Sequence, residues 1–276
     1  MWWSMKYMYR SYNTKIVETP TYIEIYQYET PIVTKASEER SKSKLEFLSE
    51  DSTRKSFEEM SASEQAESLK RKQKHYESMR WEIARLVDCN FDNKTKFVTL
   101  TFRKNVESID YANDEFRKFI QRLNYRLYCT KKATLKYLAT WEKQKRGSIH
   151  YHVIFFNLPF IKNLELKNIW KHGFVKINKI DVDSKDNRGR YVSKYFSKDL
   201  EIKEHKKKAF FKSQNLKTPL VEKISSTKEI DLTNKNIVYT NEYTQKVPIF
   251  KGGIAENNRN IEFEDRTVRY TKIKKE

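Results

Sequence analysis

Two histidines separated by one residue carry the clearest chemical potential in this sequence. His150 and His152 lie in the segment Gly147–Phe156, whose β-branched and aromatic residues favour a buried β-strand. Side chains alternate between the two faces of a strand, so both imidazoles point to the same side and Tyr151 points to the other. Two imidazoles on one rigid strand could form half of a metal site, or could simply be histidines of a core strand.

A carboxylate that precedes this strand could supply a third ligand. Glu142 follows a strand predicted from Leu135 to Trp141, and a basic turn, residues 143–147, leads into the histidine strand in a β-hairpin pattern. If the hairpin closes, Glu142 reaches the histidine face. Two imidazoles and one carboxylate leave positions for water and a phosphate oxygen, a set that suits Mg²⁺ or Mn²⁺ and does not exclude Zn²⁺. Glu142 taken alone could equally be a solvent-facing residue at a turn.

A second group of reactive residue types lies in a helix predicted for residues 188–200. One face of this helix carries four residues at positions i, i+3, i+4 and i+7, namely Tyr191, Lys194, Tyr195 and Lys198. A phenol is a poor nucleophile near its ordinary pKa of about 10, but neighbouring ammonium groups and a metal favour the phenolate. Attack on a DNA phosphate would give a 5′-phosphotyrosine and free a 3′-OH. The alternative is an amphipathic surface helix that merely covers the sheet.

The elements that must position these residues form an alternating series between residues 96 and 200. Besides the hairpin and the final helix, the patterns predict a strand at Phe97–Phe102, a helix at 110–128 that Asp110 can cap, a short helix at Asn163–Lys171 ending at Gly173, and a strand at Phe174–Ile180. This order predicts an α+β fold, in which helices pack on one largely antiparallel sheet.

The regions on either side of this series carry weaker signals. Tyr22–Glu29 alternates as a strand limited by Pro20 and Pro31, residues 36–63 resemble a linker or a loose helix, and a basic helix is predicted from Ser63 to Val87. Beyond residue 200, a lysine cluster precedes two possible short strands, Ile237–Tyr239 and Val247–Phe250. We therefore expect an N-terminal extension (1–90), a central domain (91–200) and a basic C-terminal extension (201–276).

The charge of the chain indicates a polyanionic partner. The 276 residues include 56 Lys and Arg against 37 Asp and Glu, a formal charge of +19. Nucleic acid is the simplest partner, because the aromatic residues could also stack on bases, and an anionic membrane surface is the main competitor. Cys89 and Cys129 form no metal-spaced pair, and we found no secretory signal and no apolar run long enough for a membrane helix. We expect a cytoplasmic protein that is not embedded in a membrane.

Three segments, in order, resemble the motifs of the HUH endonucleases. His150-Tyr151-His152 is similar to their His-hydrophobic-His triplet, and Tyr191–Lys198 is similar to the tyrosine motif of their rolling-circle replication initiators. Phe97–Phe102 resembles the first motif, a Thr-rich strand. Order and spacing match phage and plasmid initiators, including the filamentous-phage gene II type. The resemblance covers residues 96–200, and Tyr151 departs mildly from it by standing where an aliphatic residue is usual.

The resemblance implies a ferredoxin-like or RRM-like sheet whose central strand binds a metal. It implies a replication-associated endonuclease that nicks one strand of a double-stranded replicative form at the origin and later rejoins the displaced strand. The implied metal ligands are His150, His152 and Glu142; the implied nucleophiles are Tyr191 and Tyr195; the residues that position the phosphate are Lys194 and Lys198. Relatives with a glutamate at the first tyrosine position place the indispensable nucleophile second, so we expect Tyr195 to initiate.

Several other functions remain compatible with the sequence. None of its five glycines belongs to a Gly-x-x-x-x-Gly-Lys-Ser/Thr loop, so an initiator of this kind would need a host helicase and polymerase at its origin DNA. A relaxase or transposase would use the same site for transfer or insertion. A zinc hydrolase would use the histidines to activate water and leave no covalent adduct. A non-enzymatic basic nucleic-acid-binding protein would explain the charge but not the clustered His, Glu and Tyr.

Overall fold

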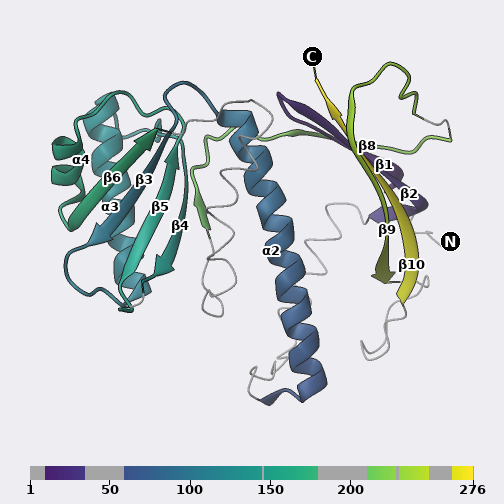
Figure 1. The fold of residues 1–276 in the computed structure, drawn as a ribbon, viewed down its shortest axis with the longest axis horizontal. Coiled ribbons are helices and arrows are strands. Elements are labelled where there is room, and N and C mark those ends of the chain that lie inside the picture. The colour runs from purple at the N-terminus through teal and green to yellow at the C-terminus, as the bar shows by residue number, and fades with distance from the viewer. Residues whose placement is uncertain are drawn as a thin grey trace, which may run out of the picture. The chain divides into compact units, whose positions relative to one another are not determined.

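The structure, a computed structural model, describes residues 10–34, 59–144, 146–179, 210–227, 230–248 and 263–275 (Figure 1). The chain forms two compact units. Unit 1 comprises residues 1–60 together with 219–276, and unit 2 comprises residues 61–218. Each unit contains one five-stranded antiparallel sheet, so the strands before and after unit 2 in the sequence pair with each other.

Unit 2 contains the alternating series that the sequence predicts. Its elements are α2 (Ala62–Asn90), β3 (Lys96–Phe102), α3 (Ile109–Tyr128), β4 (Tyr137–Lys143), β5 (Ile149–Phe155), α4 (Asn163–Trp170), β6 (Gly173–Lys179) and β7 (Phe210–Lys212). The strand order is β6-β3-β5-β4-β7, and every pair is antiparallel. From β3 to β6 the chain runs β-α-β-β-α-β with spatial order fourth, first, third, second, which is the ferredoxin-like arrangement. The α+β fold expected from the sequence is confirmed, with β7 added beside β4.

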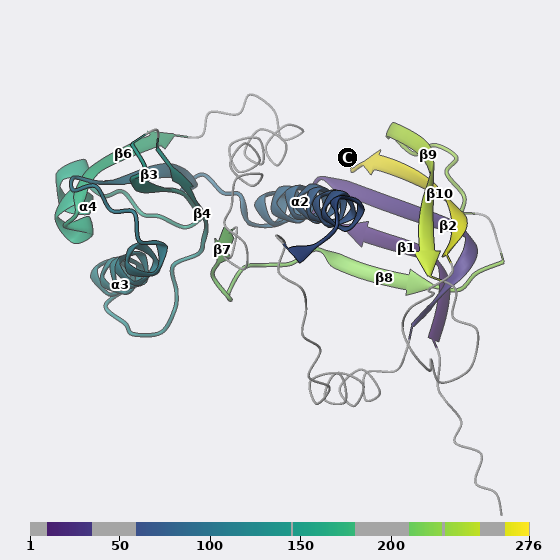
Figure 2. The same ribbon diagram turned by 90° about the horizontal axis from the view of Figure 1, so that it is seen from below.

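One face of this sheet forms the core of unit 2 together with α3 and α4 (Figure 2). Ile149, Tyr151 and Val153 on β5 are fully buried there. The Tyr151 ring stacks on Phe116 with 4.5 Å between ring centroids, and its hydroxyl donates a hydrogen bond to Asn113 Oδ1 at 2.7 Å. The central strand is therefore fixed by side chains on the face opposite to the histidines.

The other face of the sheet is covered at one end by the last turns of α2. Ile83, Leu86 and Val87 pack there against a cluster of buried sheet residues that includes Ile154. Ile154 follows His150 and His152 at alternate positions of β5, so it lies on their face. The cluster at the end of α2 consequently anchors the strand face that carries the histidines.

Helix boundaries in unit 2 differ in detail from the sequence predictions. Ser108, not Asp110, caps α3: its hydroxyl accepts a hydrogen bond from the Tyr111 N–H, and Asp110 lies in the first turn. The α4 helix ends at Lys171, which adopts φ 70°. Gly173 is therefore not the helix stop but the first residue of β6. A Cβ at this position would lie 2.3 Å from the Thr101 carbonyl oxygen, so the close approach of β6 to β3 requires glycine.

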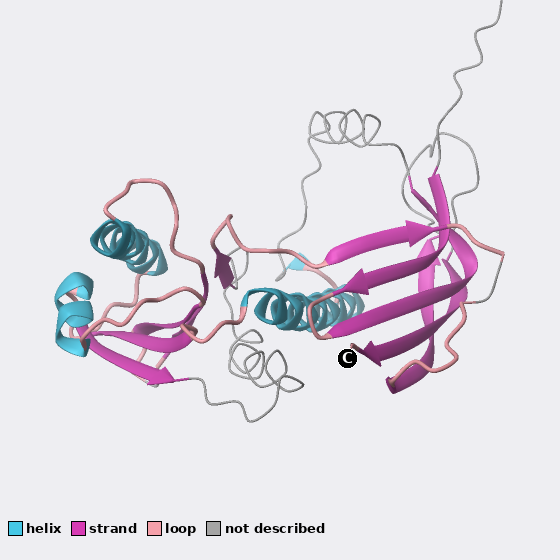
Figure 3. Cartoon of the chain, turned by 90° about the horizontal axis from the view of Figure 1, so that it is seen from above, coloured by secondary structure: helices cyan, strands magenta, loops and turns pink. Residues whose placement is uncertain are grey.

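Unit 1 consists of long strands of mixed polarity. They are β1 (Arg10–Glu18), β2 (Tyr22–Thr34), β8 (Leu220–Ile224), β9 (Ile237–Pro248) and β10 (Phe263–Lys274), in the order β8-β1-β2-β10-β9 (Figure 3). The two short strands predicted after residue 236 belong to the single strand β9. The prediction that Pro31 limits the strand is wrong, because β2 continues to Thr34. A register shift in β1 leaves residues 28–31 without partners in β1, so the missing N–H of Pro31 interrupts no hydrogen bond between these two strands.

None of the helices in the described ranges is both long and apolar enough to cross a membrane.

Candidate metal centre

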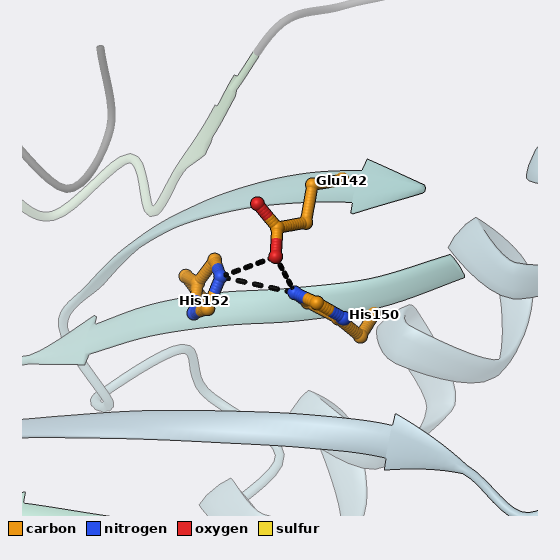
Figure 4. Close-up of side chains that lie close together, drawn as sticks. All are labelled: Glu142, His150 and His152. Carbon is orange, nitrogen blue, oxygen red and sulfur yellow. Dashed lines mark hydrogen bonds and ion pairs between the residues drawn. The ribbon is translucent and has the colours of Figure 1, made fainter. Parts of the chain in front are cut away.

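The β4–β5 hairpin brings Glu142 beside the two histidines. Glu142 and His150 are directly opposite in the strand register, and His152 lies opposite Thr140. One carboxylate oxygen of Glu142, Oε1, contacts Nε2 of His150 and lies 3.1 Å from Nε2 of His152 (Figure 4). The two Nε2 atoms are also 3.1 Å apart. The three side chains singled out in the sequence therefore converge on one point, and their ligand atoms lie within 4.8 Å of one another.

Neighbouring strands fix the orientation of the His152 ring. Thr99 on β3 lies opposite His152, and its Oγ1 is 3.3 Å from His152 Nδ1. Phe97 stacks on the same imidazole with 5.4 Å between ring centroids. A hydrogen bond at one ring nitrogen determines which nitrogen is available to a ligand, so Thr99 directs Nε2 toward Glu142. The sequence analysis included Thr99 in a motif but assigned it no role, because the contact depends on strand register.

The donor set and two of its three ligand separations fit a divalent cation, whereas Glu142 Oε1 and His150 Nε2 are in direct contact. Adjacent ligands of an octahedral ion with bonds of about 2.1 Å lie about 3 Å apart. The separation of the two Nε2 atoms and that between His152 Nε2 and Glu142 Oε1 are both 3.1 Å. His150 is buried, and its Nδ1 has no hydrogen-bond partner in the described part of the chain. His150, His152 and Glu142 could thus hold a metal ion, and the same N/O set accepts Mg²⁺, Mn²⁺ or Zn²⁺.

The second group of predicted site residues cannot be placed beside this centre. The tyrosine segment, with Tyr191, Lys194, Tyr195 and Lys198, lies outside the described residues, as does the helix predicted for 188–200. The geometry of the candidate site therefore consists of the Glu142–His150–His152 cluster and the sheet face around it.

Comparisons with known proteins point to DNA replication. Residues 95–200 match the model of a family described as the replication-associated protein ORF2, or gene II protein. The chain is also similar to the phasyl DNA replicon protein arp of Escherichia coli, with 26% identity over 149 residues. That match covers 45% of this chain and 50% of the relative, so the chain spans about half the length of the relative it matches. No solved structure matches the chain.

Proposed function

Residues 95–200 belong to the family of replication-associated ORF2 and gene II proteins, the filamentous-phage gene II type, and from this we propose that the chain nicks one strand of its origin DNA to start rolling-circle replication. The observation that carries the proposal is the convergence of Glu142, His150 and His152 on two adjacent strands of the family domain. The formal charge of +19 supports DNA as the substrate.

In this proposal, the reaction is a transesterification with Tyr195 as the first nucleophile. The phenol oxygen forms a bond to phosphorus, the bond between phosphorus and the 3′ oxygen breaks, and the 3′ oxygen takes up a proton as the phenol loses one. A divalent cation held by Glu142, His150 and His152 would polarise the scissile phosphate. The phosphodiester between two nucleotides is replaced by a phosphodiester between a nucleotide and tyrosine. Because the number of phosphodiester bonds is unchanged, the later rejoining step needs no nucleotide triphosphate. A host helicase unwinds the duplex, and a host polymerase extends the free 3′-OH.

The rest of the site has two tasks in this proposal. The strands β4 and β5 hold the two imidazoles and the carboxylate in fixed positions, because β5 is packed on both faces. In the helix predicted for residues 188–200, Lys194 and Lys198 would lie one turn apart and would hold the phosphate between them by charge. Tyr191, which precedes Tyr195 by four residues in the sequence, would attack when the regenerated origin is cut at the end of the round.

Mapping a covalent adduct tests this function. Circular duplex DNA carrying the origin is incubated with the protein and Mn²⁺, and the nicked strand is digested and examined by mass spectrometry for a tyrosine–nucleotide peptide. We expect the 5′ end to be attached to protein and the 3′ end to be free. Nicks with free 5′ phosphates would instead identify a metal-dependent hydrolase, and binding without cleavage would identify a non-enzymatic DNA-binding protein. Transfer to a second DNA in preference to recircularisation would favour a relaxase or transposase.

Substitution of each tyrosine tests the division of labour. Tyr195→Phe should lose the initial adduct, because the initiating oxygen is missing. Tyr191→Phe should still nick but fail to release closed single-stranded circles, as gel analysis of the products would show. The assignment is reversed if Tyr191→Phe alone lacks the adduct, and it is wrong if each single variant completes the whole cycle.

A further inference from the structure

The edge strand β6 extends the histidine face of the sheet in unit 2. Residues directly opposite each other in antiparallel strands point to the same face. Phe174 lies opposite Thr101, and Thr101 lies opposite His150. On the same face, Lys176 of β6 lies opposite Thr99 of β3, and Thr99 in turn lies opposite His152 of β5. Phe174 and Lys176 therefore continue two rows of side chains that begin at the candidate metal centre.

The two faces of β6 differ sharply in exposure. Val175, which points to the core, is buried, whereas the Phe174 ring on the histidine face is 62% exposed and Lys176 is exposed. A single exposed aromatic residue is common on protein surfaces. What distinguishes Phe174 is its position. Its exposed ring and the exposed ammonium group of Lys176 lie on the same sheet face as the three candidate metal ligands.

The distance from Phe174 to the metal centre suits a nucleotide strand. Neighbouring strands are about 4.8 Å apart, so Phe174, two strands from His150, lies about 10 Å from it. A single strand whose phosphate occupies the metal centre could pass over β3 and reach β6 within about two nucleotides. Sheets that bind single-stranded nucleic acid use exposed aromatic residues as stacking platforms and basic residues as phosphate contacts.

We propose that Phe174 and Lys176 form a subsite for single-stranded DNA beside the scissile phosphate, in which a base stacks on the Phe174 ring and the Lys176 ammonium group contacts the backbone. The subsite rests on the proposed nicking function, because that function places DNA at Glu142, His150 and His152. It makes β6 the element that aligns the nucleotides flanking the cleaved bond. The base on Phe174 is held by its face, so the subsite favours no particular base.

Binding in chelator tests the subsite apart from catalysis. We would measure the affinity of a single-stranded origin oligonucleotide by fluorescence anisotropy in excess EDTA. Phe174→Ala should weaken binding by about 5- to 150-fold, the range seen when a stacking ring is removed. Phe174→Trp should restore affinity, and its emission should be quenched by DNA. Phe160→Ala is the matched control, because Phe160 is 90% exposed and lies in the loop before α4, where the neighbouring Ile161 packs in the core on the other face of the sheet.

Lys176 gives a second, independent readout. Lys176→Ala should reduce the slope of log affinity against log salt by about one, whereas Lys167→Ala on the exposed surface of α4 should leave the slope unchanged. The subsite is wrong if Phe174→Ala binds as tightly as the wild type, or if Phe160→Ala loses as much affinity. If wild type forms the tyrosine adduct but Phe174→Ala binds normally, only the subsite fails. If Phe174→Ala binds weakly but wild type forms no adduct, only the nicking function fails.

The sheet of unit 1 carries a separate surface that the family match does not include. Its strand register and ring contacts place seven tyrosines on one face, namely Tyr12, Tyr22, Tyr26, Tyr28, Tyr239, Tyr243 and Tyr270. Lysine ammonium groups lie over rings of the same face: Lys223 is 4.9 Å from the Tyr12 centroid, and Lys15 is 5.4 Å from that of Tyr26. The opposite face instead carries isoleucines, among them Ile16, Ile25 and Ile273.

We infer that this tyrosine-lysine face is a second binding surface for single-stranded DNA, independent of the catalytic site. The rings offer stacking platforms, and the lysines complement the phosphate charge. The accessible part is on β9, where Tyr239 is 53% exposed and Tyr243 is 39% exposed. An anionic membrane surface is the competing occupant, because it would also be attracted by the lysines, and the test below separates it from DNA.

Successive side chains of β9 point to opposite faces of the sheet, which provides a matched test. Tyr239→Ala combined with Tyr243→Ala should weaken binding of an oligo-dT strand by at least about tenfold. Thr244→Ala, an exposed neighbour on the other face of the same strand, should bind like the wild type, and circular dichroism should show both variants folded. Equal losses in the two variants, or no loss in either, would overturn the inference. So would binding of wild type to anionic phosphatidylserine vesicles in the absence of binding to oligo-dT.

Discussion

The two sheets of this chain have equal strand numbers but are stabilised differently. In unit 2, six of the seven residues of β5 are buried, and only His152 is intermediate. In unit 1, the buried apolar residues among those described are Val17, Ile25, Val268, Tyr270 and Ile273, and all five residues of β8 are exposed. Ring contacts between tyrosines and cation–π contacts with lysines take the place of a large aliphatic core there.

This difference matches what each sheet is proposed to do. Metal ligands must be held within a fraction of an ångström, and a strand packed on both faces provides that precision. A flexible polymer is bound by many weak contacts, which the tyrosine rings and ammonium groups of the unit 1 sheet, with Tyr239 and Tyr243 exposed, would provide. In these proposals the two five-stranded sheets serve different purposes because different side chains alternate along their strands.

The largest effect should come from removing a ligand of the metal centre. His152→Ala, like His150→Ala, should reduce metal-dependent nicking by more than the roughly 10- to 100-fold that loss of an orienting partner costs. The variants should still fold and bind DNA in chelator, because the larger hydrophobic cluster of unit 2 lies on the other face of β5. Gel assays of nicking with a Mn²⁺ titration measure this effect. Full nicking by wild type in excess chelator would contradict a metal role.

Removing a core side chain should lower the free energy of unfolding more in unit 2 than in unit 1. Trp170→Ala should lower the free energy of unfolding of unit 2 by about 3–5 kcal/mol, because the indole is fully buried and its N–H donates to the Thr101 carbonyl at 3.1 Å. Val268→Ala in unit 1 removes a much smaller buried side chain and should cost about 2 kcal/mol. Urea unfolding curves of both variants give the comparison. A larger loss from Val268→Ala would mean that unit 1 depends on its core more than its composition indicates.

A moderate effect should follow from removing the hydroxyl group that orients the His152 ring. Thr99→Val keeps the shape of the side chain but removes the hydroxyl near Nδ1, so metal affinity should fall by about tenfold. Isothermal titration with Mn²⁺ measures the change. Thr244→Val in unit 1 serves as the control, because it makes the same chemical change on an exposed strand. Equal affinity in Thr99→Val and wild type would show that packing by Phe97 alone orients the ring.

The smallest effect concerns alkaline stability. Burial raises the pKa of Tyr28 to about 12, with a further contribution from the nearby Tyr12 and Tyr243. The neutral phenol is therefore favoured in the folded state: its contribution to stability is complete below pH 10 and is lost as the pH rises toward 12. Tyr28→Phe should make the free energy of unfolding of unit 1 less dependent on pH in this range. An unchanged pH slope in urea titrations would show that Tyr28 is not responsible.

The sequence predicts unit 2 well because its signals are local. β3 alternates between apolar and polar residues, and β5 is rich in β-branched and aromatic residues. A short turn at Gly147 joins β4 to β5, so pairing Glu142 with His150 requires no long-range information. The site residue that sequence reasoning missed, Thr99, contacts His152 across strands 53 residues apart in sequence. Only the register of β3 against β5 could have revealed that contact.

The sequence predicts unit 1 poorly for the opposite reason. β10 reads Phe-Glu-Asp-Arg-Thr-Val-Arg-Tyr-Thr-Lys-Ile-Lys, in which charged residues occupy both faces and hide the period of a strand. β1, β8 and β10 are absent from the sequence predictions, which include only fragments of β2 and β9. These strands are defined by partners far away in the sequence, as when Arg266 donates to Thr30 across 236 residues.

The position of β10 between β2 and β9 has a consequence for synthesis on the ribosome. Every strand of unit 2 leaves the ribosome before β10 does, so unit 2 can fold while unit 1 still lacks a central strand. Until then β8, β1 and β2 can form at most a three-stranded sheet, in which the edge of β2 that β10 will cover is unpaired. A nascent chain stalled before residue 263 could therefore carry a folded Glu142–His150–His152 cluster while the tyrosine-lysine face is still incomplete.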